Sequence, residues 1–108
     1  MTIKWVQVDP LVQNGEPFCY GSRLTVRQLL EMRCNGLTLV EILTRHPELR
    51  RMGIAAAFVF AADHPERYAD FLEPDGSLVG PGFTDDQAAG LPDRLRAPGI
   101  VVKPPVAA

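Results

Sequence analysis

The longest unbroken apolar run in the chain extends from Ile54 to Ala62 and reads IAAAFVFAA. A helix that is apolar around its whole circumference is normally buried on every side. At nine residues the run is too short for a membrane helix, which needs about 20. We therefore expect a buried helix whose outer face is covered by the C-terminal part of the chain, by a second copy or by another protein.

Three helical patterns occupy the middle of the chain. Thr25 and Thr38 are suited to cap the first two, and Glu41 completes a capping box with Thr38. Asn35-Gly36 ends the first helix, and Pro47 bounds the second. The third is expected from Arg50 or Arg51 to His64, and Pro65 can open a further short helix to Leu72. The predicted buried face of the first helix carries Val26, Leu29, Leu30 and Cys34.

The two ends of the chain lack the helical pattern of the middle. Residues 3–8 alternate and 17–20 can return as a second strand, which predicts a short N-terminal β element. From Glu73 onward prolines and glycines interrupt the chain every few residues, with one capped helical turn at 84–89 and a β-like stretch at 100–102. We expect a domain of residues 1–72 and an irregular acidic segment, 73–108, that packs on the chain itself or on a partner.

Charge is divided unevenly although the net charge is only −2. Residues 21–52 carry six arginines against three glutamates, whereas residues 63–93 carry eight acidic residues against one arginine. This asymmetry favours two surfaces with different partners. The first residues lack a signal sequence, and the two cysteines form neither a disulfide framework nor a zinc motif, so a cytoplasmic protein is expected.

Residues 35–62 follow the sequence pattern of a helix-turn-helix unit, in which a glycine ends one helix and a capped helix and a tight connection follow. A plain three-helix bundle needs the same apolar spacing, so both readings stay open. The third helix offers few polar groups that could contact base edges. Arginines at its start and before it could instead bind DNA phosphates. The candidate DNA-binding residues are Arg23, Arg27, Arg45, Arg50 and Arg51. For Arg27, an ion pair with Glu31 on the helix surface is the simpler alternative.

No pattern supports catalysis, and none calls for a cofactor. Two His-Pro-Glu triplets, at 46–48 and 64–66, are better explained as helix or turn starts than as metal sites, because further ligands at suitable spacing are missing. Neither cysteine belongs to a nucleophile motif. We predict no catalytic residues, no metal site and no enzyme activity.

Several motifs resemble those of domain-of-unknown-function family 433, a group of VapB-like antitoxins. They are GEPFCYGSRLTV at 15–26, NGLT at 35–38, EIL at 41–43 and HPEL at 46–49, with the family's spacing kept over about residues 3–65. The resemblance implies a mainly α fold with a three-helix, homeodomain-like helix-turn-helix core. It also implies a type II toxin–antitoxin pair, in which the antitoxin binds its operator DNA and a toxin, often a PIN-like ribonuclease.

The resemblance is not complete. Tyr20, Ser22, Thr25, His46 and Glu48 depart from the residues usual in the family's motifs, and Arg51 and Met52 stand where an acidic pair is usual. Residues after Leu72 lie outside the resemblance, so it says nothing about the C-terminal segment.

Together these observations predict an antitoxin that binds operator DNA through its helix-turn-helix and a toxin through its C-terminal part. A homodimer is expected, and no membrane association. The apolar third helix favours an alternative, a protein-interaction or dimerisation module without DNA binding. In either case the residues expected at a partner or dimer interface are Ala56, Val59, Phe60 and Phe71.

Overall fold

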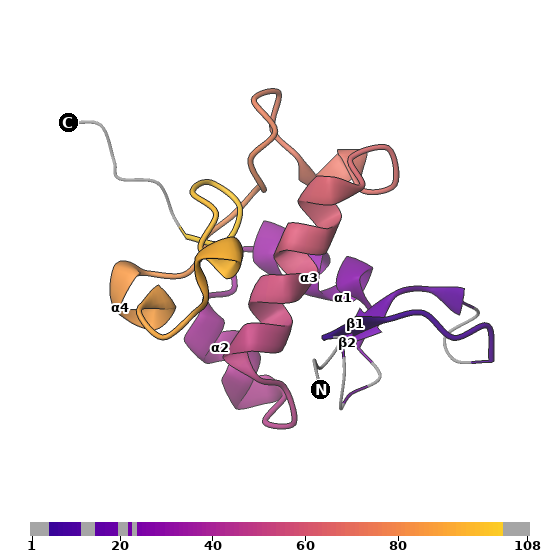
Figure 1. Ribbon diagram of the computed structural model, residues 1–108, viewed down its shortest axis with the longest axis horizontal. Helices are drawn as coiled ribbons and strands as arrows, with labels where there is room; N and C mark the ends of the chain where they lie inside the picture. Colours follow the sequence, from indigo (N-terminus) through magenta and orange to yellow (C-terminus); the bar gives the residue numbers. More distant parts are fainter. Residues whose placement is uncertain (1–4, 12–14, 20–21, 23, 103–108) are drawn as a thin grey trace.

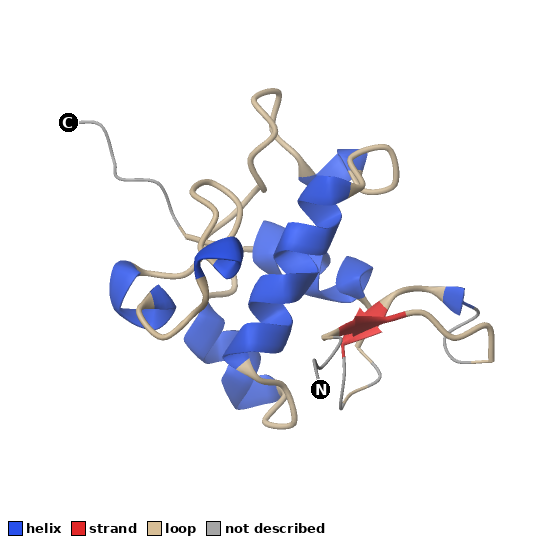
Figure 2. Ribbon diagram, viewed as in Figure 1, coloured by secondary structure: helices blue, strands red, loops and turns tan. Residues whose placement is uncertain are grey.

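The computed structural model describes residues 5–11, 15–19, 22 and 24–102, which form a mainly α structure with a small N-terminal hairpin (Figures 1 and 2). Helix α3 crosses the middle, with the hairpin on one side and the C-terminal segment on the other (Figure 1). No helix in this part of the chain is long and apolar enough to cross a membrane. In chain order the elements are β1 (Val6–Gln7), β2 (Phe18–Cys19), α1 (Val26–Cys34), α2 (Leu39–Arg45), α3 (Arg51–Asp63), the 3-10 turn η2 (Ala69–Phe71), α4 (Asp85–Ala88) and the 3-10 turn η3 (Asp93–Leu95).

Short-range capping explains where α1, α2 and α4 begin. In each case a threonine hydroxyl accepts a hydrogen bond from the main-chain N–H three residues later. The Gln or Glu side chain at that later position in turn accepts a hydrogen bond from the main-chain N–H of the threonine. The boxes at Thr38 and Thr84 confirm the sequence predictions. Gly36, with φ of 90°, adopts the left-handed conformation that follows α1, as its position after the helix indicated.

Strands β1 and β2 pair antiparallel, with Val6 opposite Cys19 and Gln7 opposite Phe18. The predicted β element is thus confirmed in its central residues, whereas residues 3–4 and Tyr20 lie outside the described part. Both strands contact α3. A mainly α fold with an N-terminal hairpin is therefore present, and the homeodomain-like classification stays a prediction.

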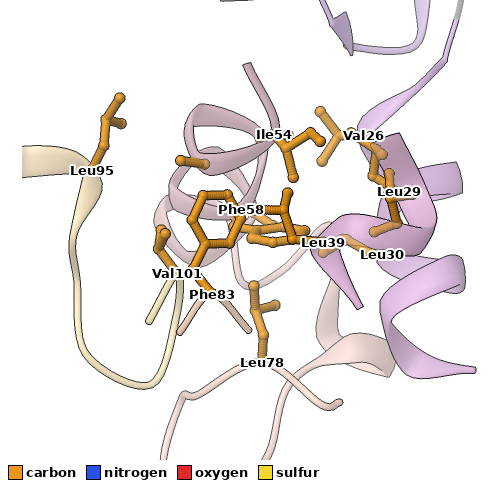
Figure 3. Close-up of a cluster of buried hydrophobic side chains, with 14 of the residues drawn as sticks. Val26, Leu29, Leu30, Leu39, Ile54, Phe58, Leu78, Phe83, Leu95 and Val101 are labelled. Carbon is orange, nitrogen blue, oxygen red and sulfur yellow. The ribbon is translucent and has the colours of Figure 1, made fainter. Parts of the chain in front are cut away.

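The chain itself covers much of the apolar helix α3. Six of its residues are buried: Gly53, Ile54, Ala55, Ala57, Phe58 and Ala61. Phe58 packs among side chains from α1 and α2 and from the C-terminal segment (Figure 3). Its ring meets the edge of Phe83 at 6.2 Å between centroids and 74° between planes. Of the three covers considered for this helix, the C-terminal segment supplies one: its buried apolar residues are Leu78, Phe83, Ala88, Leu91, Leu95 and Val101. The domain division at residue 72 stays a prediction.

Three local expectations are wrong. Cys34 is exposed and Arg33 takes its place on the buried face of α1, because the C-terminal segment packs against that side of the helix. Residues 66–72 form only η2, since Tyr68 is drawn into the core and Leu72 turns extended to bridge Leu78. Residues 100–102 are a turn in which only Val102 makes bridge contacts, to Phe83 and Pro98, instead of a strand.

Candidate functional site

The connection between α2 and α3 brings together three of the predicted arginines. Arg45 ends α2, Arg50 is the N-cap residue of α3, and Arg51 is its first residue. All three are exposed. Arg51 donates a hydrogen bond to the main-chain carbonyl of Gln87, with 2.8 Å between Nη1 and O. Within the described ranges none of the three forms an ion pair with a carboxylate.

An open cleft of about 520 Å³ lies beside these arginines. Its lining is mostly apolar and includes the two arginines at the start of α3: Trp5, Leu43, Leu49, Arg50, Arg51 and Met52. Leu49 is buried and so forms part of the core, whereas Met52 is 37% exposed. We call this cleft together with Arg45 the α2–α3 corner.

Trp5 reaches the α2–α3 corner because the hairpin packs on the first turns of α3. A Cβ added to Gly53 would lie 3.4 Å from Cε3 of Trp5, which shows how closely the indole approaches the helix backbone. On the β2 side the thiol of Cys19 lies 3.8 Å from the carbonyl oxygen of Gly53. Both strands of the hairpin therefore pack close to the α3 backbone at Gly53, where an added Cβ would be in van der Waals contact with the indole.

Among the described α-helices, α3 is the one whose N-cap residue, Arg50, makes no side-chain hydrogen bond, and like α1 it has no acidic residue in its first turn. The N-terminus of a helix carries partial positive charge and free N–H donors. At the α2–α3 corner these donors add to the charge of the arginines, so the surface favours anionic groups.

The other two predicted arginines are not part of this corner. Arg27 lies on α1 near the opposite end of α3, with its guanidinium 5.4 Å from the ring centre of Tyr68 and 5.7 Å from that of Phe71. Its Nη2 donates to the carbonyl of Arg67 at 3.0 Å, and in the described part of the chain no ion pair links it to Glu31. Arg23 lies outside the described residues. The five arginines therefore do not form one continuous surface in the part that is described.

The predicted interface residues are half-buried within the chain. Ala56, Val59 and Phe60 share one face of α3, and Phe71 lies in η2. Phe60 stacks on His64 at 4.1 Å between ring centres and meets the edge of Tyr68 at 6.3 Å. The structure leaves part of each side chain accessible, and their role at an interface stays a prediction.

Helix α3 has little that could read a DNA sequence. Its exposed residues are Arg51, Met52 and Asp63, and all the others are buried or half-buried. Base recognition in the major groove needs a row of exposed polar side chains. Contacts from α3 to DNA would therefore be restricted to phosphates near its first turn.

Titratable groups elsewhere are dispersed or buried. Within the described residues no three His, Cys, Asp or Glu side chains are grouped so that they could hold a metal ion. Nδ1 of His64 is hydrogen-bonded to the main-chain carbonyl oxygen of Phe60 at 2.8 Å. Nδ1 of His46 lies 3.7 Å from Oε1 of Glu48. Burial raises the pKa of the Cys19 thiol to about 12, which leaves little thiolate at neutral pH.

The sequence pattern did not reveal the apolar half of the corner. Leu43 and Leu49 are apolar positions of the helix-turn-helix pattern with no sign of a cleft, and Trp5 falls within the strand predicted for residues 3–8. Their meeting in one cleft depends on how the hairpin packs on α3, some 45 residues away in the chain. The sole tryptophan of the chain, next to a charged helix start, is the one signal that could have singled the place out.

Comparison with known proteins shows which family the chain resembles. The pattern of the family described as "Protein of unknown function (DUF433)" matches residues 6–61, from β1 to the last turns of α3. The crystal structure of a DUF433 member protein from Anabaena variabilis, at 2.00 Å resolution, is similar with a TM-score of 0.58 and 26% sequence identity. The similar region covers 61% of this chain and 65% of that chain, which is less than two-thirds of the relative's length. A comparison with curated proteins gave no match.

Proposed function

The chain belongs to the DUF433 family of proteins of unknown function, and from this premise we propose that it is a non-catalytic, antitoxin-type protein that binds a partner protein at its α2–α3 corner. The observation that carries the proposal is the combination of an apolar cleft with arginines that no carboxylate of the described chain neutralises. Tryptophan, methionine and arginine are the residue types enriched in the centres of protein–protein interfaces.

The antitoxin part of the proposal comes from the motifs between residues 15 and 49, which resemble those of VapB-like antitoxins. On this view the partner is a toxin, for which a PIN-like ribonuclease is the expected class. We place its docking at the α2–α3 corner ahead of the C-terminal segment, because residues 78–101 already bury their apolar side chains against α1 and α3. A homodimer through Ala56, Val59, Phe60 and Phe71 is compatible with this placement, because these residues lie outside the lining of the cleft.

Binding of operator DNA is the second candidate function. Three exposed arginines around a helix start favour it, since backbone N–H groups and arginines at such places bind phosphate. The burial of α3 weighs against base-specific reading and in favour of salt-dependent phosphate contact. A homeodomain-like use of α3 as a recognition helix has less support.

The partner test uses the tagged chain as bait in its native host. The expected result is one co-purifying protein that arrests growth when it is expressed alone and no longer does so when this chain is expressed with it. Replacing Arg50 and Arg51 together by Glu should abolish both co-purification and rescue. A matched control is the double replacement of Arg67 and Arg94 by Glu, which changes the charge equally at two other exposed positions.

A gel-shift assay at low and moderate salt tests the DNA candidate in parallel. Preferential binding to the DNA upstream of the chain's own gene, lost in the Arg50/Arg51 variant and kept in the control, would support operator binding. Equal and negligible binding to all duplexes would leave the protein-binding proposal. If no growth-arresting protein is recovered, the antitoxin proposal is wrong.

A further inference from the structure

We propose that the α2–α3 corner binds an acidic segment of the partner that carries one bulky apolar side chain. The apolar side chain enters the cleft beside Trp5 and Leu43, and a carboxylate of the segment meets Arg50 and the free N–H groups at the start of α3. This inference rests on the proposed function, since it specifies the chemistry of the partner at the same surface.

Charge complementarity is the first argument. Arg45, Arg50 and Arg51 are exposed, and none is paired with a carboxylate in the described part of the chain. Helices α2 and α4 have a side-chain cap and an acid in their first turn, whereas α3, the longest of the helices, has neither. A carboxylate from a partner would supply both, because it accepts hydrogen bonds from the N–H groups and carries the sign that the helix start favours.

The apolar lining is the second argument, and it decides which anion is favoured. The cleft of about 520 Å³ is as large as clefts that hold drug-sized ligands, so it has room for one bulky side chain. Four of its six lining residues are apolar: Trp5, Leu43, Leu49 and Met52. A DNA backbone offers phosphates to the arginines but no apolar side chain to fill the cleft. A peptide segment with an apolar anchor next to acidic residues satisfies both halves of the site.

The chain's own acidic segment does not supply a carboxylate to the α2–α3 corner in the arrangement that the structure shows. Helix α4 lies next to the α2–α3 corner, where Arg51 bonds to the carbonyl of Gln87, yet Asp85 and Asp86 on α4 form no ion pair with the corner arginines in the described residues. The acids in the first turn of α4 are adjacent to its own N-terminus, where they stabilise that helix. The corner thus keeps its positive charge for an external segment.

Selection from a display library of random 12-residue peptides tests this chemistry without knowledge of the partner. We expect the peptides enriched on the wild-type protein to share at least one Asp or Glu close to a Leu, Ile, Phe or Met. On the Arg50→Glu/Arg51→Glu variant the acidic peptides should be lost, and peptides with Lys or Arg beside the same apolar residue should replace them. The Arg67→Glu/Arg94→Glu control should enrich the wild-type class.

Trp5 allows binding to be followed directly, because it is the sole tryptophan of the chain and lines the cleft. A synthetic peptide of the enriched class should change its fluorescence in a saturable way, and the Arg50/Arg51 variant should weaken binding by about tenfold or more. The same peptide with its apolar residue replaced by Ser, and a DNA duplex, are titrated alongside. Circular dichroism of each variant checks that the helices are intact.

Enriched peptides without acidic residues, or binding that the Ser-substituted peptide or the duplex equals, would overturn the inference. A change of fluorescence with protein concentration alone would also overturn it, since the cleft would then be occupied by a second copy of the chain. If a growth-arresting partner is found but still binds the Arg50/Arg51 variant, this inference fails while the antitoxin proposal survives. If peptides bind as expected but no such partner exists, the corner's chemistry stands and the antitoxin proposal fails.

Discussion

Gly80 packs directly against the main-chain carbonyl of Arg33, so that a Cβ at position 80 would overlap that oxygen. The side chain of Arg33 continues the same contact: it donates hydrogen bonds to the carbonyls of Ile100 and Leu78, and its guanidinium lies 4.7 Å from the ring centre of Phe58. One residue at the end of α1 therefore holds the C-terminal segment with both its backbone and its side chain.

Gly80→Ala should destabilise the fold far more than Gly76→Ala. Both glycines have positive φ, 95° and 90°, so an alanine is strained by about 1–2 kcal/mol at either position. Only Gly80 also faces a backbone atom, whereas a Cβ at Gly76 would meet nothing within 4 Å. Relief of the overlap requires α1 and the segment to separate, for which we expect about 1–3 kcal/mol more. Urea unfolding of the two variants measures the difference, and equal midpoints would contradict the close packing of Gly80 on α1.

Arg33→Lys should make stability depend on pH in a range where the wild type is insensitive at this position. Burial lowers the pKa of Arg33 to about 10, which shows that its surroundings disfavour the charged form. The same burial should lower the pKa of a lysine, normally about 10.4, while the unfolded chain keeps the normal value. Between the two values the unfolded state binds more protons, so stability rises with pH. Unfolding of the variant relative to the wild type between pH 7 and 9, below the range in which Arg33 itself titrates, should show this rise, and a flat difference would indicate that the lysine reaches solvent.

The contrast between α1 and its surroundings shows what the sequence could and could not reveal. Thr25, Thr38 and Gly36 predict helix ends correctly because caps act between residues three or four positions apart. The burial of Arg33 is set by carbonyl groups 45 and 67 residues further along, and no local pattern contains that information. A charged residue such as Arg33 is normally predicted to be exposed, which is why its apolar neighbour Cys34 was assigned to the core instead.

The same limit applies to the C-terminal segment and to the α2–α3 corner. Leu78, Phe83 and Val101 are buried without a helical or strand period, so periodicity could not mark them as core. The arginines of the corner were found from the sequence because they adjoin a predicted helix start. Trp5 was not, because its place depends on the packing of the hairpin on Gly53.

Tyr68→Phe should stabilise the protein, although tyrosine and phenylalanine differ only by the hydroxyl group. Tyr68 is fully buried, and its hydroxyl has no hydrogen-bond partner among the described residues. Removing an unsatisfied buried hydroxyl should raise the free energy of unfolding by about 1 kcal/mol. Burial also raises the pKa of Tyr68, so the unfolded state loses its proton first and stability falls as the pH rises above about 10. The variant should lack this part of the alkaline decline, and a loss of stability at neutral pH would instead reveal a partner for the hydroxyl.

The two cysteines should differ sharply in their reaction with a thiol reagent. Cys34 is exposed, whereas Cys19 is buried next to Gly53 and burial raises its pKa to about 12. Because the thiolate is the reactive form, Cys19 should react only when the fold opens. Native protein at pH 8 should consume one equivalent of reagent quickly and the second only in urea. Cys34→Ser should remove the fast phase, and rapid labelling of this variant would contradict the packing of β2 on α3.

Phe60→Arg should convert the expected homodimer to a monomer while the helices remain. The ring of Phe60 is half-buried and stacks on His64, so the long stem of an arginine can follow the same path and place its charge in solvent. In a dimer interface that charge would be desolvated without a partner, which costs association far more than folding. Val40→Arg, at a position 60% exposed on α2, is the control for the added charge alone. Light scattering should give half the wild-type mass for Phe60→Arg and an unchanged mass for the control. A wild-type protein that is already monomeric would remove the dimer from the proposed function, and it would leave Phe60, His64 and Tyr68 as an aromatic cluster that only stabilises the end of α3.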